Sequence, residues 1–500
     1  MKTIKTKTAA YLLAASVCLL LTNAKANNVS IVNVGVGTVA NTLTFTISWD
    51  NSWRANQPPY SNDAVWVFVK YSNCIAVPVW THASLSTVDA NHSAGAGLEV
   101  KAVTDGMGVF IQPNAIKMPQ SAIAATNVLI TMTIPAGTYN FRVYGIEMVY
   151  TPQGDFWVGD GHTLWYTPFT STTITSSHET TTGINANTLL AASTAVPVAY
   201  PVGWVSFYCM KYEISQQEWV DFLNALTYDQ QATRTLATAP PSSAVNTYAM
   251  AAAGANRNGI KISATGTAST VPAVYACDLN GNNAYYDADD GMNVAANWLS
   301  WGDLSAFLDW AALRPMTELE YEKECRGTDA RVDMESPSGT FNYYFRNCCG
   351  LMWGGTGWAT SGALTAGTSG YATETSTASG QNCLMAINGS AAQGPLRVGF
   401  AATGGTTRVL SGSGFYGVMD LGGNVWERTI NATTIDGVAF TGALGDGALD
   451  AATGDANVAN WPTAAAALGT GYRGAAWNTP ASGSDIGCAC LNWTGFREAS

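Results

Sequence analysis

The stretch GFYGVMDLGGNVWE, residues 414–427, decides the fold expected for the C-terminal part of the chain. It combines closely spaced glycines with two acidic residues, Asp420 and Glu427, and a tryptophan. We expect Trp426 to fill core space and Asn424 to shape a turn. A segment this rich in glycine favours irregular backbone, whose hydrogen-bonding groups need side-chain partners.

Three further blocks lie around this stretch. They are FYCMKYEISQQEWVDFLNAL (207–226), NWLSWGDLSAFLDWAALRPMTELEYEKECRG (297–327), and YRGAAW (472–477) with the tripeptide GFR (495–497). Together with residues 414–429, and in the same order, the blocks resemble motifs of the formylglycine-generating-enzyme (sulfatase-modifying-factor) family. The resemblance covers roughly residues 183–500. It implies the family fold, a C-type-lectin-like α+β domain rich in irregular loops.

The resemblance raises the question of whether the family's oxidase chemistry is present. In catalytic members, two cysteines follow the R-G-G-S-[FW] motif, bind copper and activate oxygen. The matching positions here hold Thr479 and Ser484, and cuprous copper prefers thiolate ligands. We therefore expect no enzymatic activity. The alternative is a copper-dependent formylglycine-generating oxidase, acting on sulfatase cysteines, whose thiolates come from Cys488 and Cys490.

Some members of the family have the same fold without oxidase chemistry. The resemblance therefore implies a lectin-like domain for ligand binding, adhesion or self-assembly. The partner would be a surface glycan, a protein ligand, or copies of the chain itself in a homo-oligomer or polymer such as a filament, sheath or layer. Only 12% of residues are charged, about half the usual share, so the surface repels its own copies weakly. The net charge of −12 argues against a nucleic-acid partner.

Residues 1–26 have the features of a signal peptide: basic residues, an apolar run and a small-residue cleavage site. We expect a secreted protein that is extracellular or lies at the cell surface. Because no other apolar run reaches 18 residues, we expect no membrane span. Nine cysteines follow the signal peptide. An odd number leaves at least one thiol free or paired between chains, and the disulfide pairing stays open.

The N-terminal part, residues 27–150, is predicted to be an all-β immunoglobulin-like sandwich. Leu43, Phe45, Ile47 and Trp49 alternate with polar residues, as in a half-buried strand. Residues 64–71 (AVWVFVKY) are apolar on both faces, as in a central strand. Residues 151–182 form a connector, and the formylglycine-generating-enzyme-like domain is predicted at 183–500.

Three capping boxes predict helices in the second part: Ser215-x-x-Glu218, Ser300-x-x-Asp303 and Thr317-x-x-Glu320. Gly327 is expected to end the third helix. Three arginines are expected to tie loops through carbonyls and carboxylates. They are Arg314, Arg326 and Arg497.

Two structural calcium sites are predicted, and calcium is the only cofactor expected. In residues 277–291, oxygen ligands fall at calcium-loop spacing: Asp278, Asn280, Asn282, the Ala284 carbonyl and Asp289. The alternative is an Asn/Asp-rich turn without an ion. The family resemblance implies a second site made of the carbonyls of Asp420, Gly423 and Val425 and the carboxylate of Glu427. The alternative role for Glu427 is to pair with a core arginine.

Overall fold

The computed structural model describes residues 29–159, 169–328, 394–402, 411–474 and 476–478, and the backbone of four short strands between 357 and 384. The proposed signal peptide lies outside the described residues. So do Thr479, Ser484, Cys488, Cys490 and Arg497. The described chain is mostly β-structure with few, short helices. None of those helices has the length and apolar character needed to cross a bilayer.

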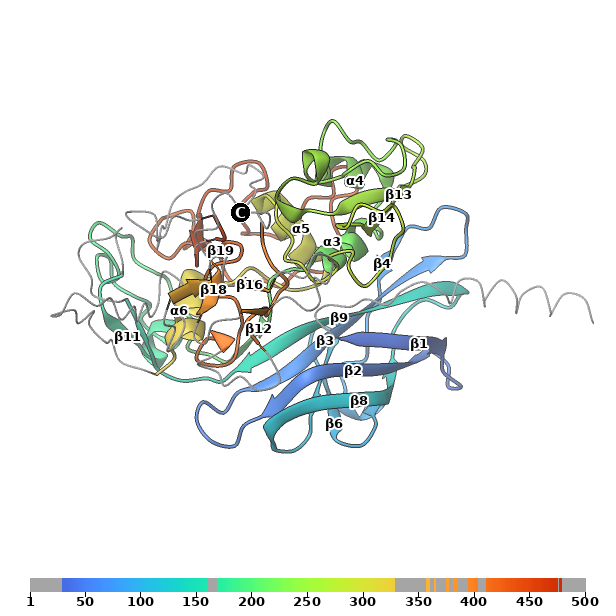
Figure 1. Cartoon of the computed structure of the whole chain (residues 1–500). Helices are drawn as coiled ribbons and strands as arrows, with labels where there is room; N and C mark the ends of the chain where they lie inside the picture. The colour runs from blue at the N-terminus through green and yellow to red at the C-terminus, as the bar shows by residue number, and fades with distance from the viewer. Residues whose placement is uncertain are drawn as a thin grey trace, which may run out of the picture.

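The N-terminal part consists of two packed β-layers (Figure 1). Its strands are β1 (Ser30–Val36), β2 (Thr42–Arg54), β3 (Asn62–Asn73), β4 (Thr81–His82), β5 (Ser93–Ala94), β6 (Leu98–Ala102), β7 (Val109–Pro113), β8 (Lys117–Thr131) and β9 (Tyr139–Thr151). In one layer β2 pairs with β1 and β8. In the other, β3 pairs with β9 and β7, and β7 with β6. The layers connect where Arg54 pairs with Asn62.

The predicted alternation in β2 is confirmed. Leu43, Phe45, Ile47 and Trp49 are all buried between the two layers, and the polar residues between them are half-buried. The apolar side chains of one strand face leave water together, which is the main stabilisation of such a sandwich.

Strand β3 is apolar on both faces because it lies between two cores. Val65, Val67 and Val69 pack against β1, β2 and β8. Trp66 and Phe68, on the opposite face, join a second core that extends to residues beyond 156. The prediction of a central strand is therefore confirmed, and its outer neighbour is the C-terminal part of the chain.

The C-terminal part also shares a sheet with the N-terminal part. Strand β12 (Phe207–Met210) pairs antiparallel with β9 and adds a strand to its layer. Side chains of β3 reach across this junction. The Trp66 indole donates to the Ala311 carbonyl at 2.8 Å, and the Lys70 ammonium donates to Trp310 and Gly447 carbonyls, both at 2.7 Å. The β3–β9 sheet and the core on its outer face thus extend into the C-terminal part, past the connector expected at 151–182.

All three predicted capping boxes are present, and each begins a helix. The helices are α2 (Ser176–Thr180), α3 (Gln216–Leu223), α4 (Tyr228–Arg234), α5 (Trp301–Trp310) and α6 (Glu318–Arg326). Gly327 follows α6 at φ 58°, the conformation that favours glycine. Helix α4 was not predicted, although Thr227 and Gln230 form a capping box at its start.

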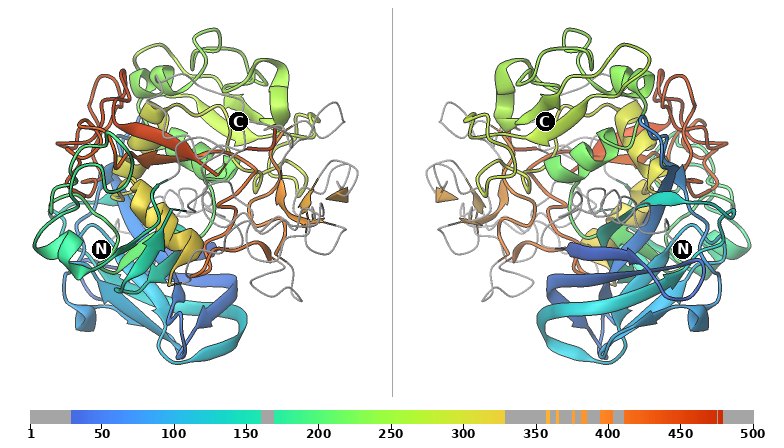
Figure 2. Two further views of the ribbon diagram at one scale, coloured as in Figure 1. Left: turned by 90° about the vertical axis from the view of Figure 1, so that its left-hand side faces the viewer. Right: turned by 90° about the vertical axis from the view of Figure 1, so that its right-hand side faces the viewer.

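The remaining strands form small two-stranded sheets among long loops (Figure 2). They are β10 (Phe156–Val158), β11 (Thr172–Ile174), β13 (Ile260–Ala264), β14 (Val274–Cys277), β15 (Gly357–Ala359), β16 (Leu364–Thr365), β17 (Thr375–Ser376), β18 (Gln381–Leu384), β19 (Glu427–Ile430) and β20 (Thr470–Arg473). The tie predicted for Arg326 is confirmed, since it donates to the Gly159 carbonyl at 2.5 Å. Arg473, which the sequence analysis did not name, is a further buried arginine and pairs with Glu318 and Glu322.

Candidate functional site

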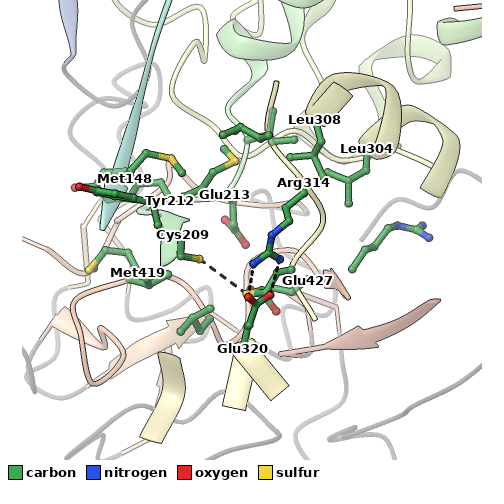
Figure 3. Close-up of a pocket in the computed structure, with 18 of the residues that line it drawn as sticks. Met148, Cys209, Tyr212, Glu213, Leu304, Leu308, Arg314, Glu320, Met419 and Glu427 are labelled. Carbon is green, nitrogen blue, oxygen red and sulfur yellow. Dashed lines mark hydrogen bonds and ion pairs between the residues drawn. The ribbon is translucent and has the colours of Figure 1, made fainter. Parts of the chain in front are cut away.

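A cavity of about 470 Å³ lies where strand β12, helix α5 and residues 414–427, called the signature segment below, meet (Figure 3). Its walls are largely apolar, with the aromatic rings of Tyr208, Trp298 and Trp426 and several methionines. Charged side chains enter from three segments that are far apart in sequence. They are Glu213, Arg314, Glu320, Glu427 and Arg428. A concave, mainly apolar pocket with a few fixed polar groups is the usual form of a ligand site.

The Arg314–Glu320 pair forms one fixed, charge-balanced wall of the pocket. The guanidinium contacts the two carboxylate oxygens at 2.5 and 2.8 Å and also donates to the Pro315 carbonyl. Glu320 additionally accepts from the Thr317 amide at 2.9 Å, since it belongs to the capping box of α6. The tie predicted for Arg314 is confirmed. Its two-point geometry fixes the orientation of both groups.

Cys209 brings a thiol into the pocket from strand β12. Its sulfur lies 3.9 Å from the sulfur of Met316. Burial, together with the negative charges of Glu324 and Glu320, raises the pKa of this thiol well above its ordinary range. The thiolate is the form that attacks electrophiles or binds copper, so Cys209 is held in its unreactive form. No histidine is among the described residues that line the pocket.

Glu213 holds the signature segment in place through hydrogen bonds to two of its residues. Its carboxylate accepts from the Val425 amide at 2.9 Å and from the Asn424 side-chain amide at 2.5 Å. The Asn424 side-chain oxygen accepts from the Leu396 amide at 2.7 Å, and Asn424 has φ 61°. Asn424 therefore shapes the turn, as expected. Burial and the nearby Asp420 raise the pKa of Glu213 well above its usual value.

Glu427 is the group in this site that lacks a partner. Both of its carboxylate oxygens are buried and accept no hydrogen bond from the described residues. Burial, reinforced by Glu213 and Asp420, raises its pKa well above the ordinary value. The arginine partner of the alternative role is absent among the described residues. Arg473 lies opposite Glu427 in the β19–β20 register but pairs with Glu318 and Glu322.

The surroundings of Glu427 fit a bound cation. A Cβ atom on Gly474 would lie 1.8 Å from the Glu427 carboxylate and 2.9 Å from the Leu421 carbonyl, so only glycine leaves room there. The carbonyls of Asp420, Gly423 and Val425 accept no hydrogen bond within the described part of the chain. Calcium prefers such oxygen ligands. These four residues would hold it, and its charge would neutralise the buried carboxylate.

The loop between β14 and Gly291 brings some of the predicted ligands together. The Asn280 amide nitrogen donates to Asp289 at 3.1 Å, and Asn282 accepts from the Ala284 amide at 2.7 Å. Asp278, by contrast, accepts from the Lys261 ammonium at 2.7 Å. Two acidic groups outside the predicted set join Asp289 instead. They are Asp287 and Asp290.

The closely spaced aspartates of this loop shift the pKa of Asp290. Burial and the charges of Asp278, Asp287 and Asp289 raise the pKa of Asp290 to about 6. Sequence spacing missed Asp287 and Asp290 because the pattern assumed a regular twelve-residue loop. The signal that could have found them was the dense run DADD at 287–290.

Comparisons with protein-family models, curated proteins and solved structures found no match. The resemblance to the formylglycine-generating-enzyme family therefore rests on the motifs quoted above and is an expectation from sequence.

Proposed function

We propose that this chain is a secreted, non-enzymatic protein that binds a ligand at the cell surface. In this proposal, residues 27–150 are an immunoglobulin-like sandwich that carries a C-type-lectin-like domain of the formylglycine-generating-enzyme family. The observation that supports a binding role most directly is the pocket of about 470 Å³ at the junction of the two parts. Hydrogen bonds fix Arg314, Glu320 and Glu213 in its walls, which suits recognition.

The pocket favours one class of ligand over the others expected. Its walls are mainly apolar and aromatic. A ligand group buried there therefore contributes most binding free energy if it is itself apolar. We therefore propose a protein ligand that inserts an aromatic or aliphatic side chain. A glycan is less suitable, because its hydroxyl groups would lose hydrogen bonds to water against these walls.

A pair of rim variants tests the binding role. Leu444 lines the pocket and is 49% exposed, whereas Leu468 is 52% exposed and does not line it. Leu444→Glu should weaken binding of the labelled full-length protein to its producing cells by about tenfold or more. Leu468→Glu, the matched control, should leave binding unchanged. Equal binding by both variants would contradict the proposal.

The absence of oxidase activity needs its own assay. Full-length protein, copper and oxygen should not convert the cysteine of a sulfatase-motif peptide to formylglycine, as followed by mass spectrometry. Conversion that disappears when Cys488 and Cys490 are replaced by serine would instead establish the oxidase alternative.

Self-assembly is the second candidate function, and strand β8 favours it. Residues 118–126 of β8 are mostly exposed and carry no charge. They pair with β2 on one side. On the other side, β5 pairs with β8 only at Val128 and Leu129 within the described residues. A free, uncharged strand edge can add a strand from another copy. Electron microscopy of material shed from cells should then show ordered filaments or sheets, and dispersed monomers would count against it.

A further inference from the structure

The loop between β14 and Gly291 gathers acidic side chains in one place. One carboxylate oxygen from each of Asp287, Asp289 and Asp290 lies within 4.8 Å of the other two. Repulsion between such close like charges is unfavourable unless a cation or a proton compensates it. Acidic clusters also occur on solvated surfaces, so proximity alone does not identify a site.

A second observation separates this cluster from a solvated surface patch. Asp290 is fully buried, with 0% of its surface exposed, and its Oδ1 atom has no hydrogen-bond partner. Asp278, behind it, is also 0% exposed and has an equally unpartnered Oδ1. Leaving a buried carboxylate oxygen without a donor is costly, and no donor among the described residues offsets it.

The remaining hydrogen bonds and ion pairs of the loop show which carboxylates a cation could bind. Lys261 donates to Asp278 and therefore balances one of the four carboxylates. The second oxygen of Asp290 accepts from the Asp287 amide at 2.7 Å. Side-chain amides of the loop asparagines reach Asp287 and Asp289 at 3.0 and 3.1 Å. Three carboxylates thus remain without a cationic partner among the described residues.

We propose that Asp287, Asp289 and Asp290 bind a divalent cation, for which calcium is the best fit, with the Asp278–Lys261 pair supporting the site. Carboxylates with a flexible loop backbone suit calcium, whose coordination is larger and less rigid than that of magnesium. Water would complete the coordination, because Asp289 is only half-buried. The proposal does not depend on the function of the pocket.

The cation would fix a loop that connects two parts of the C-terminal core. Leu279 lies against Gly291 across the loop, and its amide donates to the Asp290 carbonyl at 3.0 Å. Just beyond Gly291, the Val294 carbonyl accepts from the Gln216 amide at the start of helix α3. We expect an affinity on the order of 10⁻⁴–10⁻³ M, the range of extracellular calcium modules.

Terbium luminescence of the full-length protein tests the proposal, because terbium replaces calcium and is sensitised by nearby tyrosines. Tyr285 and Tyr286 lie within the loop. Tyrosine excitation should give terbium emission that calcium displaces and that magnesium displaces much less. Asp290→Asn should weaken terbium binding at least about tenfold. Asp289→Asn, at a less buried position, should do the same and guards against misfolding of the first variant.

Two further variants provide matched controls. Asp450→Asn alters an exposed loop aspartate whose oxygen already accepts from Thr453 and Ala452, and it should leave the emission unchanged. Glu427→Gln removes the other candidate cation ligand, which lies near Tyr321. In this background the remaining emission should still be displaced by calcium and weakened by Asp290→Asn. The proposal is overturned if wild-type protein gives no displaceable emission, or if folded Asp289→Asn and Asp290→Asn bind terbium like the wild type.

Discussion

At the scale of single residues, the buried carboxyl of Glu324 makes the stability of the protein depend on pH. Its side chain is fully buried, with 0% exposed; one oxygen accepts from the Thr151 hydroxyl and the other has no partner. Burial raises its pKa from 4.5 to about 8. A raised folded-state pKa stabilises the protein at low pH, and this stabilisation is lost as pH rises through 8.

We therefore expect Glu324 to contribute a fall of roughly 2 kcal/mol in the free energy of unfolding between about pH 6 and pH 8. Glu324→Gln keeps the shape of the protonated group but cannot ionise, so its urea midpoint should vary less over this window. Asp450→Asn, at an exposed loop, is the control and should retain the wild-type slope. If the urea midpoint changed equally with pH in the wild type and in Glu324→Gln, Glu324 would not be the titrating group.

Glu427 gives a prediction about calcium. Calcium should raise the melting temperature of the wild type, since an ion that binds only the folded state adds about 2.7 kcal/mol at one hundred times its Kd. Glu427→Gln should show a smaller rise with calcium, and in chelator it should be at least as stable as the wild type. Glu99→Gln, which alters an ion pair with Arg54, should respond to calcium like the wild type. If calcium raised the melting temperature of Glu427→Gln as much as that of the wild type, calcium binding at Glu427 would be contradicted.

Sequence could predict residues whose partners are close in the chain. Arg314 pairs with Glu320, six positions away, and both belong to recognisable motifs. Glu213, by contrast, was not singled out, although it lies in the opening block. Its partner Asn424 is 211 positions away, and no local pattern indicates which distant amide a carboxylate meets. The unpaired state of Glu427 is likewise a property of packing, because Arg473 lies opposite but pairs elsewhere.

At the scale of secondary structure, local hydrogen bonding made the helices predictable. Each predicted capping box satisfies free amides at a helix start, and this depends on only four successive residues. Strand β12 could not be predicted in this way, since its pairing with β9 joins residues far apart in the chain. The apolar pattern of β3 indicated burial on both faces but not which segment would cover the outer one.

The cap of helix α5 allows a measured comparison. The Ser300 hydroxyl donates to the Asp303 carboxylate and accepts from its amide. Ser300→Ala should destabilise the protein by about 1 kcal/mol, and Ser300→Thr should restore most of the loss. Asp303→Ala should cost more, because Asp303 also pairs with the buried Arg234 at 3.2 Å. Urea denaturation measures all three, and an unchanged midpoint for Ser300→Ala would show that the cap contributes little.

At the scale of the whole molecule, the sequence analysis predicted two domains joined by a connector at 151–182, and the structure adds how the two parts meet. Trp66, Phe68, Tyr144 and Met148 point from β3 and β9 into the core of the C-terminal part, each at most 3% exposed. These side chains would be exposed if the N-terminal part stood alone, so removing apolar surface from water couples the two parts.

This shared core predicts that the described parts unfold together. Calorimetry of the full-length protein should show one cooperative transition, because neither part can keep its apolar face from water after the other unfolds. Trp66→Ala removes a ring buried at the junction and its bond to the Ala311 carbonyl, and should cost about 3–5 kcal/mol. This loss should lower the temperature of the single transition without splitting it into two. Val67→Ala, on the opposite face of β3, should lower the same transition by less. Two resolved transitions, of which Trp66→Ala shifts only one, would instead mean that the parts fold independently.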